Sequence, residues 1–188
     1  MKKIAVFASG TGTNFDAIQR AIENKELNAE IALVVVDKKT AKVIEKARNK
    51  GIETYVFSYK DFENKAECEK EIVRRCKAAG VEWIALAGYM RIITHVLLNA
   101  FPNRIINIHP ALLPSFKGAH GIEDAYNYGC KVMGVTIHYV NEEMDAGKII
   151  AQRAFDVPEN ATLETVEAMI HQIEHVLYPE TLQKLLGE

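Results

Sequence analysis

Short apolar runs rich in β-branched side chains alternate with amphipathic segments as far as His109, and this alternation restricts the fold more than any other feature. The apolar runs, which are typical of short buried strands, are residues 4–8, 30–36, 53–57, 83–87 and 105–108. Helical spacing of apolar side chains occupies residues 14–24, 40–50 and 60–79. Because strands that alternate with such helices form βαβ units, the sequence predicts an α/β, Rossmann-like, doubly wound fold with a mainly parallel sheet.

After His109 the pattern changes to longer elements. A loop is indicated by proline and glycine, at Pro110, Pro114 and Gly118. The elements predicted beyond this loop are a helix over 119–128 and two β-rich runs, expected to pair as antiparallel strands, over 131–140 and 148–157. Thr162 is predicted to cap a long C-terminal helix, and Pro179 is expected to end it.

The composition fits one globular domain and favours no charged partner. The chain has 188 residues, of which 48% are hydrophobic and 26% charged, and its formal net charge is −2. This balance gives no reason to expect a nucleic acid or a membrane as partner, and no apolar run reaches the roughly 20 residues of a membrane span. We therefore expect a single domain over residues 1–188.

The three cysteines do not form a disulfide pattern. Cys68 and Cys76 fall on one predicted helix, about 12 Å apart along its axis. A disulfide needs Cα atoms within about 7 Å, so this pair could not close without unwinding the helix. Reduced thiols and a cytoplasmic location are therefore expected.

A glycine-rich loop, Ser9-Gly10-Thr11-Gly12-Thr13-Asn14, follows the first predicted strand and opens the first helix. Backbone N–H groups at such a turn can bind an anion together with the helix N-terminus. The spacing matches neither the dinucleotide fingerprint nor a nucleotide P-loop, which makes a single phosphate the more economical ligand. An equally good interpretation is a tight turn in which Asn14 acts as the helix N-cap.

Two polar side chains, Asn107 and His109, stand at the end of the fifth predicted strand. Residues two apart on a strand point to the same face, and Pro110 keeps His109 extended. In open parallel sheets ligands bind at the carboxyl ends of the strands, the edge that the glycine loop also faces. An amide and an imidazole there could stabilise the oxyanion of an acyl-transfer intermediate and move a proton.

Asp145 lies in the predicted loop between the last two strands. A carboxylate brought near His109 would orient the imidazole or hold a water that relays protons. Taken singly, each of these residues has an ordinary alternative role: Asn107 capping a turn, His109 as a satisfied semi-buried histidine, and Asp145 shaping a surface loop. Their joint placement beside the glycine loop favours the catalytic interpretation. No serine or cysteine has a partner residue at a spacing that would indicate a catalytic nucleophile. Direct transfer between two bound substrates is therefore expected rather than a covalent intermediate.

Four separated motifs resemble the folate-dependent glycinamide ribonucleotide formyltransferases. They are the glycine loop over 9–14, Leu86-Ala87-Gly88-Tyr89-Met90-Arg91-Ile92, Asn107-Ile108-His109-Pro110-Ala111-Leu112-Leu113-Pro114, and Met144-Asp145-Ala146-Gly147. The resemblance covers essentially the whole chain in order. It implies formyl transfer from 10-formyltetrahydrofolate, as co-substrate, to the amino group of glycinamide ribonucleotide in purine biosynthesis, without a metal.

The resemblance also implies roles for individual residues. The catalytic trio would be Asn107, His109 and Asp145. The ribonucleotide phosphate would bind at Thr11, Gly12, Thr13 and Asn14, and the rest of the ribonucleotide at Gln172 and Glu174. The folate would contact Met90, Arg91, Ile92, Val140, Asn141 and Asp145. Thr136 and His138 would fall in a strand whose neighbours line the site.

On the same basis the N-terminal part, about residues 1–100, would bind phosphate. Residues 86–188 would bind folate and carry the catalytic groups. The protein would be a monomer or a homodimer. The chain departs from the family pattern at Val35-Val36-Asp37-Lys38, where a Ser-Asn type of turn is expected, and His120 is carried over only weakly.

Rival interpretations come from several classes of protein. His171-Gln172-Ile173-Glu174-His175 spells a zinc-peptidase motif, although a third ligand at a suitable distance is lacking in the sequence. A formyltetrahydrofolate hydrolase and a methionyl-tRNA formyltransferase would share the trio, but each is expected to carry a further domain. A non-catalytic nucleotide-binding module would leave the trio unused.

Overall fold

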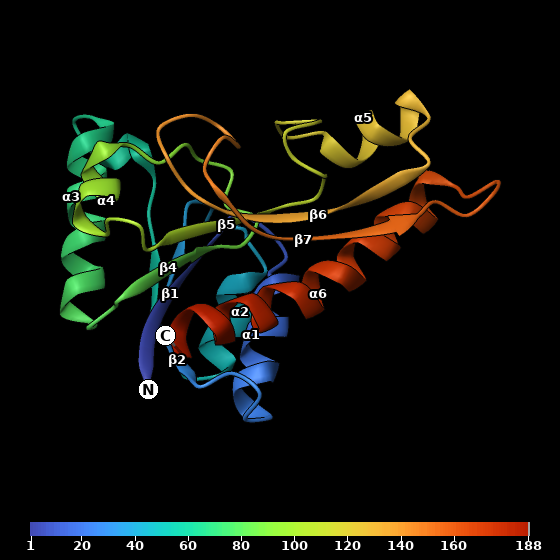
Figure 1. Ribbon diagram of the computed structural model, residues 1–188. Coiled ribbons are helices and arrows are strands. Elements are labelled where there is room, and N and C mark those ends of the chain that lie inside the picture. The colour runs from blue at the N-terminus through green and yellow to red at the C-terminus, as the bar shows by residue number, and fades with distance from the viewer. Residues whose placement is uncertain (188) are drawn as a thin grey trace.

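The computed structural model describes residues 1–187 and contains a seven-stranded sheet with helices on both faces (Figure 1). The strands are β1 (Lys2–Ala8), β2 (Ala29–Val36), β3 (Thr54–Val56), β4 (Trp83–Leu86), β5 (Ile105–His109), β6 (Val132–Tyr139) and β7 (Ile149–Asp156). Their order is β3-β2-β1-β4-β5-β6-β7; β1 to β5 are parallel, and β6 and β7 are antiparallel to their neighbours. The predicted fold class is therefore confirmed.

The helices are α1 (Thr13–Glu23), α2 (Val43–Asn49), the short 3₁₀ helix η1 (Tyr59–Asp61), α3 (Lys65–Ala78), α4 (His95–Ala100), α5 (Gly121–Tyr128) and α6 (Leu163–Gly187). The single helix predicted over 60–79 is wrong, because the Asn64 side chain accepts a hydrogen bond from the Glu67 N–H (2.9 Å) and starts α3 afresh. Helix α4 was not predicted, since six residues are too short for a periodic signal.

Helix α6 continues through Pro179, so the prediction that this proline ends the helix is wrong. Proline removes one backbone hydrogen bond, but both neighbouring turns are anchored by other contacts. The buried Tyr178 hydroxyl donates to the Leu86 carbonyl (2.8 Å), and the Thr181 hydroxyl donates to the Leu177 carbonyl (2.7 Å). The Thr162 hydroxyl caps the start of the helix as predicted, by accepting from the Thr165 N–H (3.1 Å).

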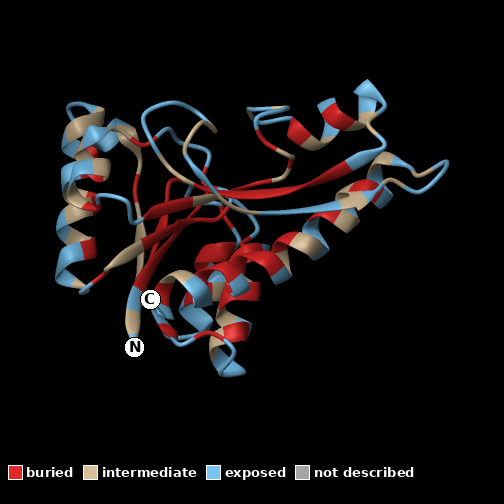
Figure 2. Ribbon diagram, in the orientation of Figure 1, coloured by how far each residue is buried: buried red, intermediate tan, exposed pale blue. Residues whose placement is uncertain are grey.

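Alternating residues of β1 separate two apolar cores, one on each face of the sheet. Ile4 and Val6 pack with side chains of α1, α2 and α6, whereas Ala5 and Phe7 pack with those of α3 and α4. Strands β1, β2, β4, β5 and β6 and the inward faces of the helices are accordingly largely buried, whereas the edge strand β7 and the connecting loops are largely exposed (Figure 2). Among the described residues, no helix combines the length and apolar character that crossing a bilayer requires.

The strand order reverses between β1 and β4, which is where open α/β sheets bind ligands. The loops that leave these two strands are tied together at their carboxyl ends. The Ser9 N–H donates to the Gly88 carbonyl (3.1 Å), and the Ser9 hydroxyl accepts from the Met90 N–H (2.9 Å). The glycine loop and the segment after β4 are thereby held side by side.

Candidate active site

A cavity of about 460 Å³ opens at the carboxyl ends of the central strands. Its walls come from six parts of the chain: residues 10–14, 86–93, 107–110 and 118–119, the positions His138, Val140, Asn141, Glu143, Met144 and Asp145, and two α6 residues, His171 and Glu174. The volume falls in the usual range for a small-molecule site.

Nearly all residues that the sequence analysis singled out line this cavity. They are Thr11, Gly12, Thr13, Asn14, Met90, Arg91, Ile92, Asn107, His109, Val140, Asn141, Asp145 and Glu174. Gln172 is exposed and does not line the cavity, whereas His171 does. Residues three apart share a helix face, so His171 accompanies Glu174 and Gln172 points elsewhere.

The glycine loop leaves the N-terminus of α1 open toward the cavity. Gly12 is the N-cap residue with φ +76°, and within the described chain no side chain caps this helix. The alternative in which Asn14 acts as the N-cap is therefore wrong. A side chain at Gly12 would also collide with Val43, because an added Cβ would lie 2.6 Å from Val43 Cγ2. The first N–H groups of the helix remain available for an anion.

Asn14 lies inside α1 and joins the two ends of the chain across the cavity. Its Nδ2 donates to Glu174 Oε2 at 2.7 Å, a contact between residues 160 positions apart. Both side chains are buried, and the Asn14 Oδ1 atom has no hydrogen-bond partner among the described residues. A buried acceptor without a partner is unusual and leaves this oxygen free for a donor on a ligand.

Asn107 and His109 lie on one side of β5 and both line the cavity, as strand alternation predicts. The antiparallel pairing of β5 and β6 places His138 opposite Asn107. Asn107 Nδ2 lies 3.2 Å from His138 Nε2. Burial lowers the pKa of His138, which favours a neutral imidazole beside the amide.

Both nitrogens of the buried His109 ring face oxygen atoms. Nε2 lies 2.8 Å from the Phe116 carbonyl oxygen, and because a carbonyl only accepts, Nε2 donates this hydrogen bond. Nδ1 faces Asp145 Oδ2 at 3.6 Å. A proton on Nδ1 would therefore lie between the imidazole and the carboxylate.

Asp145 reaches the site from the loop between β6 and β7. Its Oδ2 accepts a hydrogen bond from the Gly118 N–H (2.8 Å), and its Oδ1 lies 3.9 Å from His138 Nε2. The structure thus brings Asn107, His109 and Asp145 together. The contacts of the Phe116 carbonyl with His109 and of the Gly118 N–H with Asp145 were not predicted. Both groups are backbone atoms of a loop whose path the sequence does not reveal.

In residues 35–38, where the sequence departs from the family pattern, Asp37 contacts a residue that lines the cavity. The Asp37 side chain is buried at the end of β2, and its Oδ2 accepts a hydrogen bond from Arg91 Nε (2.7 Å). The Arg91 guanidinium also lies 5.1 Å from the centre of the Tyr59 ring, within the range of a cation–π contact. Asp37 therefore helps to fix the segment after β4.

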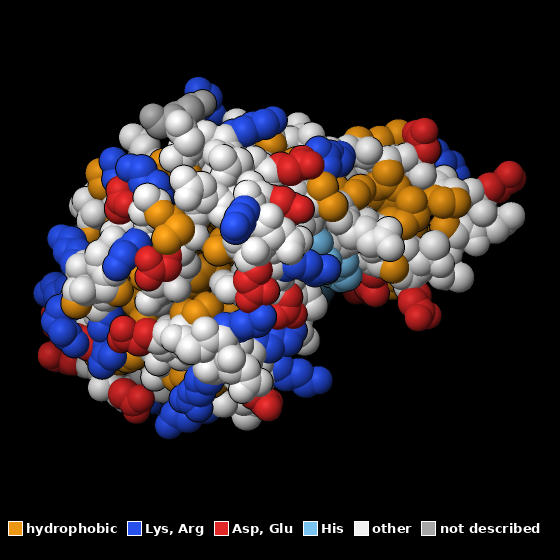
Figure 3. Space-filling model, turned by 90° about the horizontal axis from the view of Figure 1, so that it is seen from below, with side chains coloured by type: hydrophobic (Ala, Val, Ile, Leu, Met, Phe, Trp, Pro, Cys, Tyr) orange, Lys and Arg blue, Asp and Glu red, His pale blue; other side chains and the backbone are white. Residues whose placement is uncertain are grey.

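The histidines of the zinc-peptidase motif have other surroundings. The pKa of His171 is raised by its neighbour Glu174, whose Oε1 lies 3.6 Å from His171 Nδ1, whereas burial lowers the pKa of His175. Over residues 1–187, no three His, Cys, Asp or Glu side chains are grouped so as to hold a metal ion. Histidine side chains also reach the surface where the broad body of the molecule meets a narrower lobe (Figure 3).

Comparison with known proteins identifies similar chains over the full length. The model of the family described as formyl transferase matches residues 2–182. The phosphoribosylglycinamide formyltransferase of Bacillus subtilis is 50% identical over 187 residues, covering 100% of this chain and 96% of the relative. The trifunctional purine biosynthetic protein adenosine-3 of Gallus gallus is 40% identical over 96% of this chain, which spans only 18% of that longer protein.

Solved structures agree with these relatives. Glycinamide ribonucleotide transformylase 1 from Geobacillus kaustophilus superposes with a TM-score of 0.96 at 50% identity, with 100% of both chains covered. Phosphoribosylglycinamide formyltransferase from Bacillus halodurans also gives a TM-score of 0.96, at 46% identity, over 100% of this chain and 96% of the other. Both the fold and the order of its elements are therefore shared.

Proposed function

The chain belongs to the formyl transferase family and, within it, to the phosphoribosylglycinamide formyltransferases, and we propose that it transfers the formyl group of 10-formyltetrahydrofolate to the amino group of glycinamide ribonucleotide in purine biosynthesis. One observation carries this proposal: a single cavity contains both an open helix N-terminus and an amide–imidazole–carboxylate cluster. The first suits the phosphate of an acceptor, and the second suits the formyl group that the acceptor attacks.

The proposed reaction is a direct attack. The substrate amine forms a bond to the formyl carbon, and the carbonyl electron pair moves onto oxygen to give a tetrahedral oxyanion. The Asn107 N–H donates a hydrogen bond to this oxyanion, and the positive charge of His109, once it is protonated, stabilises it. The proton lost by the attacking nitrogen passes through His109, assisted by Asp145, to N10 of the folate. The bond between the carbon and N10 then breaks, which releases tetrahydrofolate and the formylated ribonucleotide.

The two substrates would contact different residues of the same cavity. The phosphate would bind the N–H groups of Thr11 to Asn14, because this loop combines free donors with the positive end of the α1 dipole. Glu174 would accept hydrogen bonds from the ribonucleotide, with His171 rather than Gln172 beside it. The folate would lie against Met90, Arg91, Ile92, Val140, Asn141 and Asp145, which also line the cavity.

An acceptor comparison tests the proposed function. The protein is incubated with 10-formyltetrahydrofolate and with glycinamide ribonucleotide, methionyl-tRNA or water as acceptor, and tetrahydrofolate release is followed. We expect release only with the ribonucleotide, together with one equivalent of formylated product. Release without an added acceptor would instead support a hydrolase, and release with methionyl-tRNA would support the tRNA enzyme.

A further inference from the structure

His138 is a buried polar group at the centre of the site to which the proposed reaction assigns no task. It lies on β6 opposite Asn107, and its side chain is in contact with two members of the trio. Nε2 is 3.2 Å from Asn107 Nδ2 and 3.9 Å from Asp145 Oδ1. Only 2% of its surface is exposed, so its hydrogen bonds are not exchanged with bulk water.

The other ring nitrogen determines the tautomer of His138. Nδ1 lies 2.8 Å from the carbonyl oxygen of Tyr139, and a carbonyl oxygen can only accept. Nδ1 must therefore carry the proton. In a neutral imidazole the second nitrogen is then an acceptor, so Nε2 accepts a hydrogen bond and cannot donate one.

This tautomer dictates how the Asn107 amide is turned. With Nδ2 toward His138, one amide N–H donates to Nε2. With the amide reversed, its oxygen would face the Nε2 lone pair, and two acceptors would oppose each other. The second N–H of Nδ2 has no other acceptor among residues 1–187, and Asn107 lines the cavity. One donor is thus held in place and free for a ligand.

We propose that His138 is a positioning residue: as a neutral imidazole protonated on Nδ1, it orients the Asn107 amide so that its second N–H can donate to the oxyanion. The inference rests on the proposed function for the identity of that oxyanion. The orientation of Asn107 itself follows from the contacts of His138 alone. A donor that is already oriented needs no reorganisation when charge develops in the transition state.

The groups around the ring favour this neutral state on balance. Burial lowers the pKa of His138, and the nearby His109 acts in the same direction. The Tyr139 carbonyl and the Asp145 carboxylate act in the opposite direction. Protonation of Nε2 would place a donor against the donor of Asn107, so a charged His138 would turn the amide away. The orienting contact is therefore present above the pKa of His138 and is lost below it.

Matched substitutions at one position test the proposal. His138→Phe keeps a planar ring but removes the acceptor, whereas His138→Gln offers an oxygen that can accept from Asn107. We expect His138→Phe to lower kcat at least about 10-fold, with the KM values of both substrates changed less than about twofold. His138→Gln should recover most of kcat. In an Asn107→Ala background, His138→Phe should cause no further loss, because contacting residues that act as a unit are not additive.

The tautomer is measured without any turnover, by ¹H–¹⁵N correlation spectra of the protein labelled in histidine. We expect protonated Nδ1 and unprotonated Nε2 for His138 at neutral pH. A proton on Nε2, or an additive loss in the Asn107→Ala background, would overturn the inference. A thermal unfolding scan of each variant separates loss of folding from loss of kcat. If the unchanged protein shows no ribonucleotide-dependent turnover, the proposed function fails, whereas the spectra still decide the orientation.

Discussion

His109 is held on both sides of its ring, an arrangement that suits the proton transfer proposed for it. The Phe116 carbonyl accepts from Nε2 at 2.8 Å, and Asp145 Oδ2 stands 3.6 Å from Nδ1. The carboxylate can stabilise an imidazolium that forms when the attacking amine loses its proton. At the scale of single residues, the proposed proton transfer would therefore depend on groups that the strand and loop hold in place.

Replacing His109 by alanine tests this role. We expect His109→Ala to lower kcat by roughly 10²- to 10⁴-fold, with a much smaller change in substrate KM. His120→Ala is the control, since that histidine is exposed at the start of α5 and lies outside the cavity lining. A loss confined to KM would show that His109 binds substrate and takes no part in proton transfer. The measurement is steady-state kinetics with both substrates varied.

His171 adds a positive charge to the wall of the cavity, near the proposed phosphate site, when it is protonated. It lies beside Glu174, which is hydrogen-bonded to Asn14 next to the open helix N-terminus. Glu174 and, to a smaller extent, Glu167 raise the pKa of His171, whereas its partial burial opposes them. His175, Arg20 and Asp16 lie around the same part of α6, and Asp16 is paired with Lys46. The charge on His171 should therefore assist binding at lower pH.

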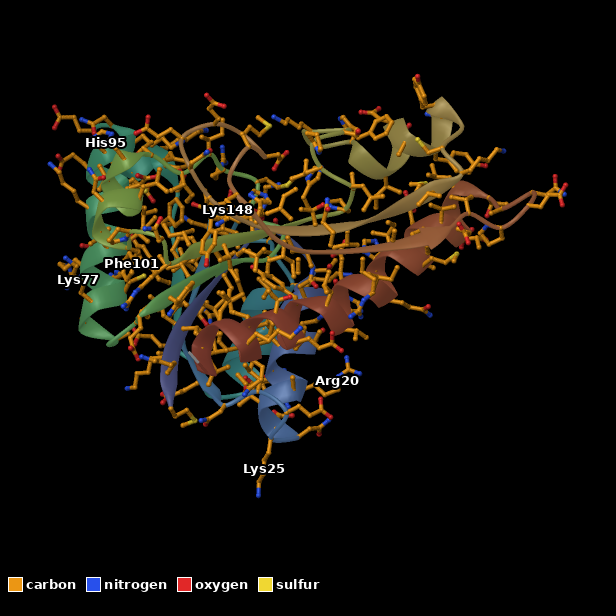
Figure 4. The ribbon with its side chains drawn as sticks, in the orientation of Figure 1. Arg20, Lys25, Lys77, His95, Phe101 and Lys148 are labelled. Atoms are coloured by element: carbon orange, nitrogen blue, oxygen red, sulfur yellow. The ribbon has the colours of Figure 1, made fainter. Side chains whose placement is uncertain are left out.

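The pH dependence of ribonucleotide binding tests this charge. Because the pKa of His171 is raised, the cation is present below that pKa and is lost as the pH rises through it. We expect the KM for the ribonucleotide to rise as the pH increases from about 6.5 to 9, and the rise should be smaller in His171→Gln. His95→Gln is the control, because His95 is exposed on α4, away from the cavity (Figure 4). If the KM for the ribonucleotide depended on pH equally in the unchanged protein, His171→Gln and His95→Gln, the charge on His171 would have no role in binding.

At the scale of elements, the loop between β6 and β7 is shaped by one close approach. An added Cβ at Gly147 would lie 1.5 Å from the Tyr139 carbonyl oxygen, so only glycine fits there. The same carbonyl accepts from His138 Nδ1, and Asp145 stands two residues before Gly147 with φ +50°. The glycine of the Met144–Gly147 motif therefore supports both the carboxylate and the imidazole.

A single methyl group should disturb this loop. We expect Gly147→Ala to displace the Tyr139 carbonyl, to lower kcat at least 10-fold, and to cost about 1–3 kcal/mol of unfolding free energy, as overpacking does. Gly187→Ala is the control, because an added Cβ there meets no atom within 4 Å. Kinetics and urea unfolding would be compared for the two variants. Wild-type activity in Gly147→Ala would show that the loop adapts without loss.

At the scale of the whole molecule, α6 connects the end of the chain to the sheet and to the first helix. Its buried side chains belong to the same core as those of β1 and α1, and Glu174 reaches Asn14 across 160 residues. The Tyr178 hydroxyl also contacts carbonyls of two neighbouring strands, those of Leu86 (2.8 Å) and Ile106 (3.3 Å). Docking of this helix therefore completes both the core and the wall of the cavity beside the open N-terminus of α1.

Two side-chain truncations on α6 measure how much the docking of this helix contributes to the free energy of unfolding. Ile170 is 0% exposed and Val176 is 48% exposed. We expect Ile170→Ala to lower the unfolding free energy by about 2–5 kcal/mol, whereas Val176→Ala should stay within about 0.5 kcal/mol. Urea unfolding monitored by circular dichroism gives both values. Similar small losses would mean that α6 packs loosely on the sheet.

The sequence by itself determined the fold class and one face of the site. Alternating β-branched and amphipathic runs encode strand and helix periods directly, so the mainly parallel sheet was predictable. The spacing of Asn107 and His109 placed both on one side of a strand for the same reason. Two helix ends were predicted wrongly from local patterns. The Asn64 cap starts a new helix within the predicted 60–79 segment, and α6 continues past Pro179, where Tyr178 is anchored to the sheet.

Only the tertiary structure decided how the polar groups meet. Asp145 Oδ2 lies 3.6 Å from His109 Nδ1 because β6 and β7 pair beside β5. The sequence of the connecting loop does not determine the register of that pairing. The backbone of Phe116 and Gly118, and the approach of Gly147 to Tyr139, depend on loop paths that side-chain periodicity does not encode. The strand order brought His138 opposite Asn107, because hydrogen bonding across a sheet joins residues distant in the chain.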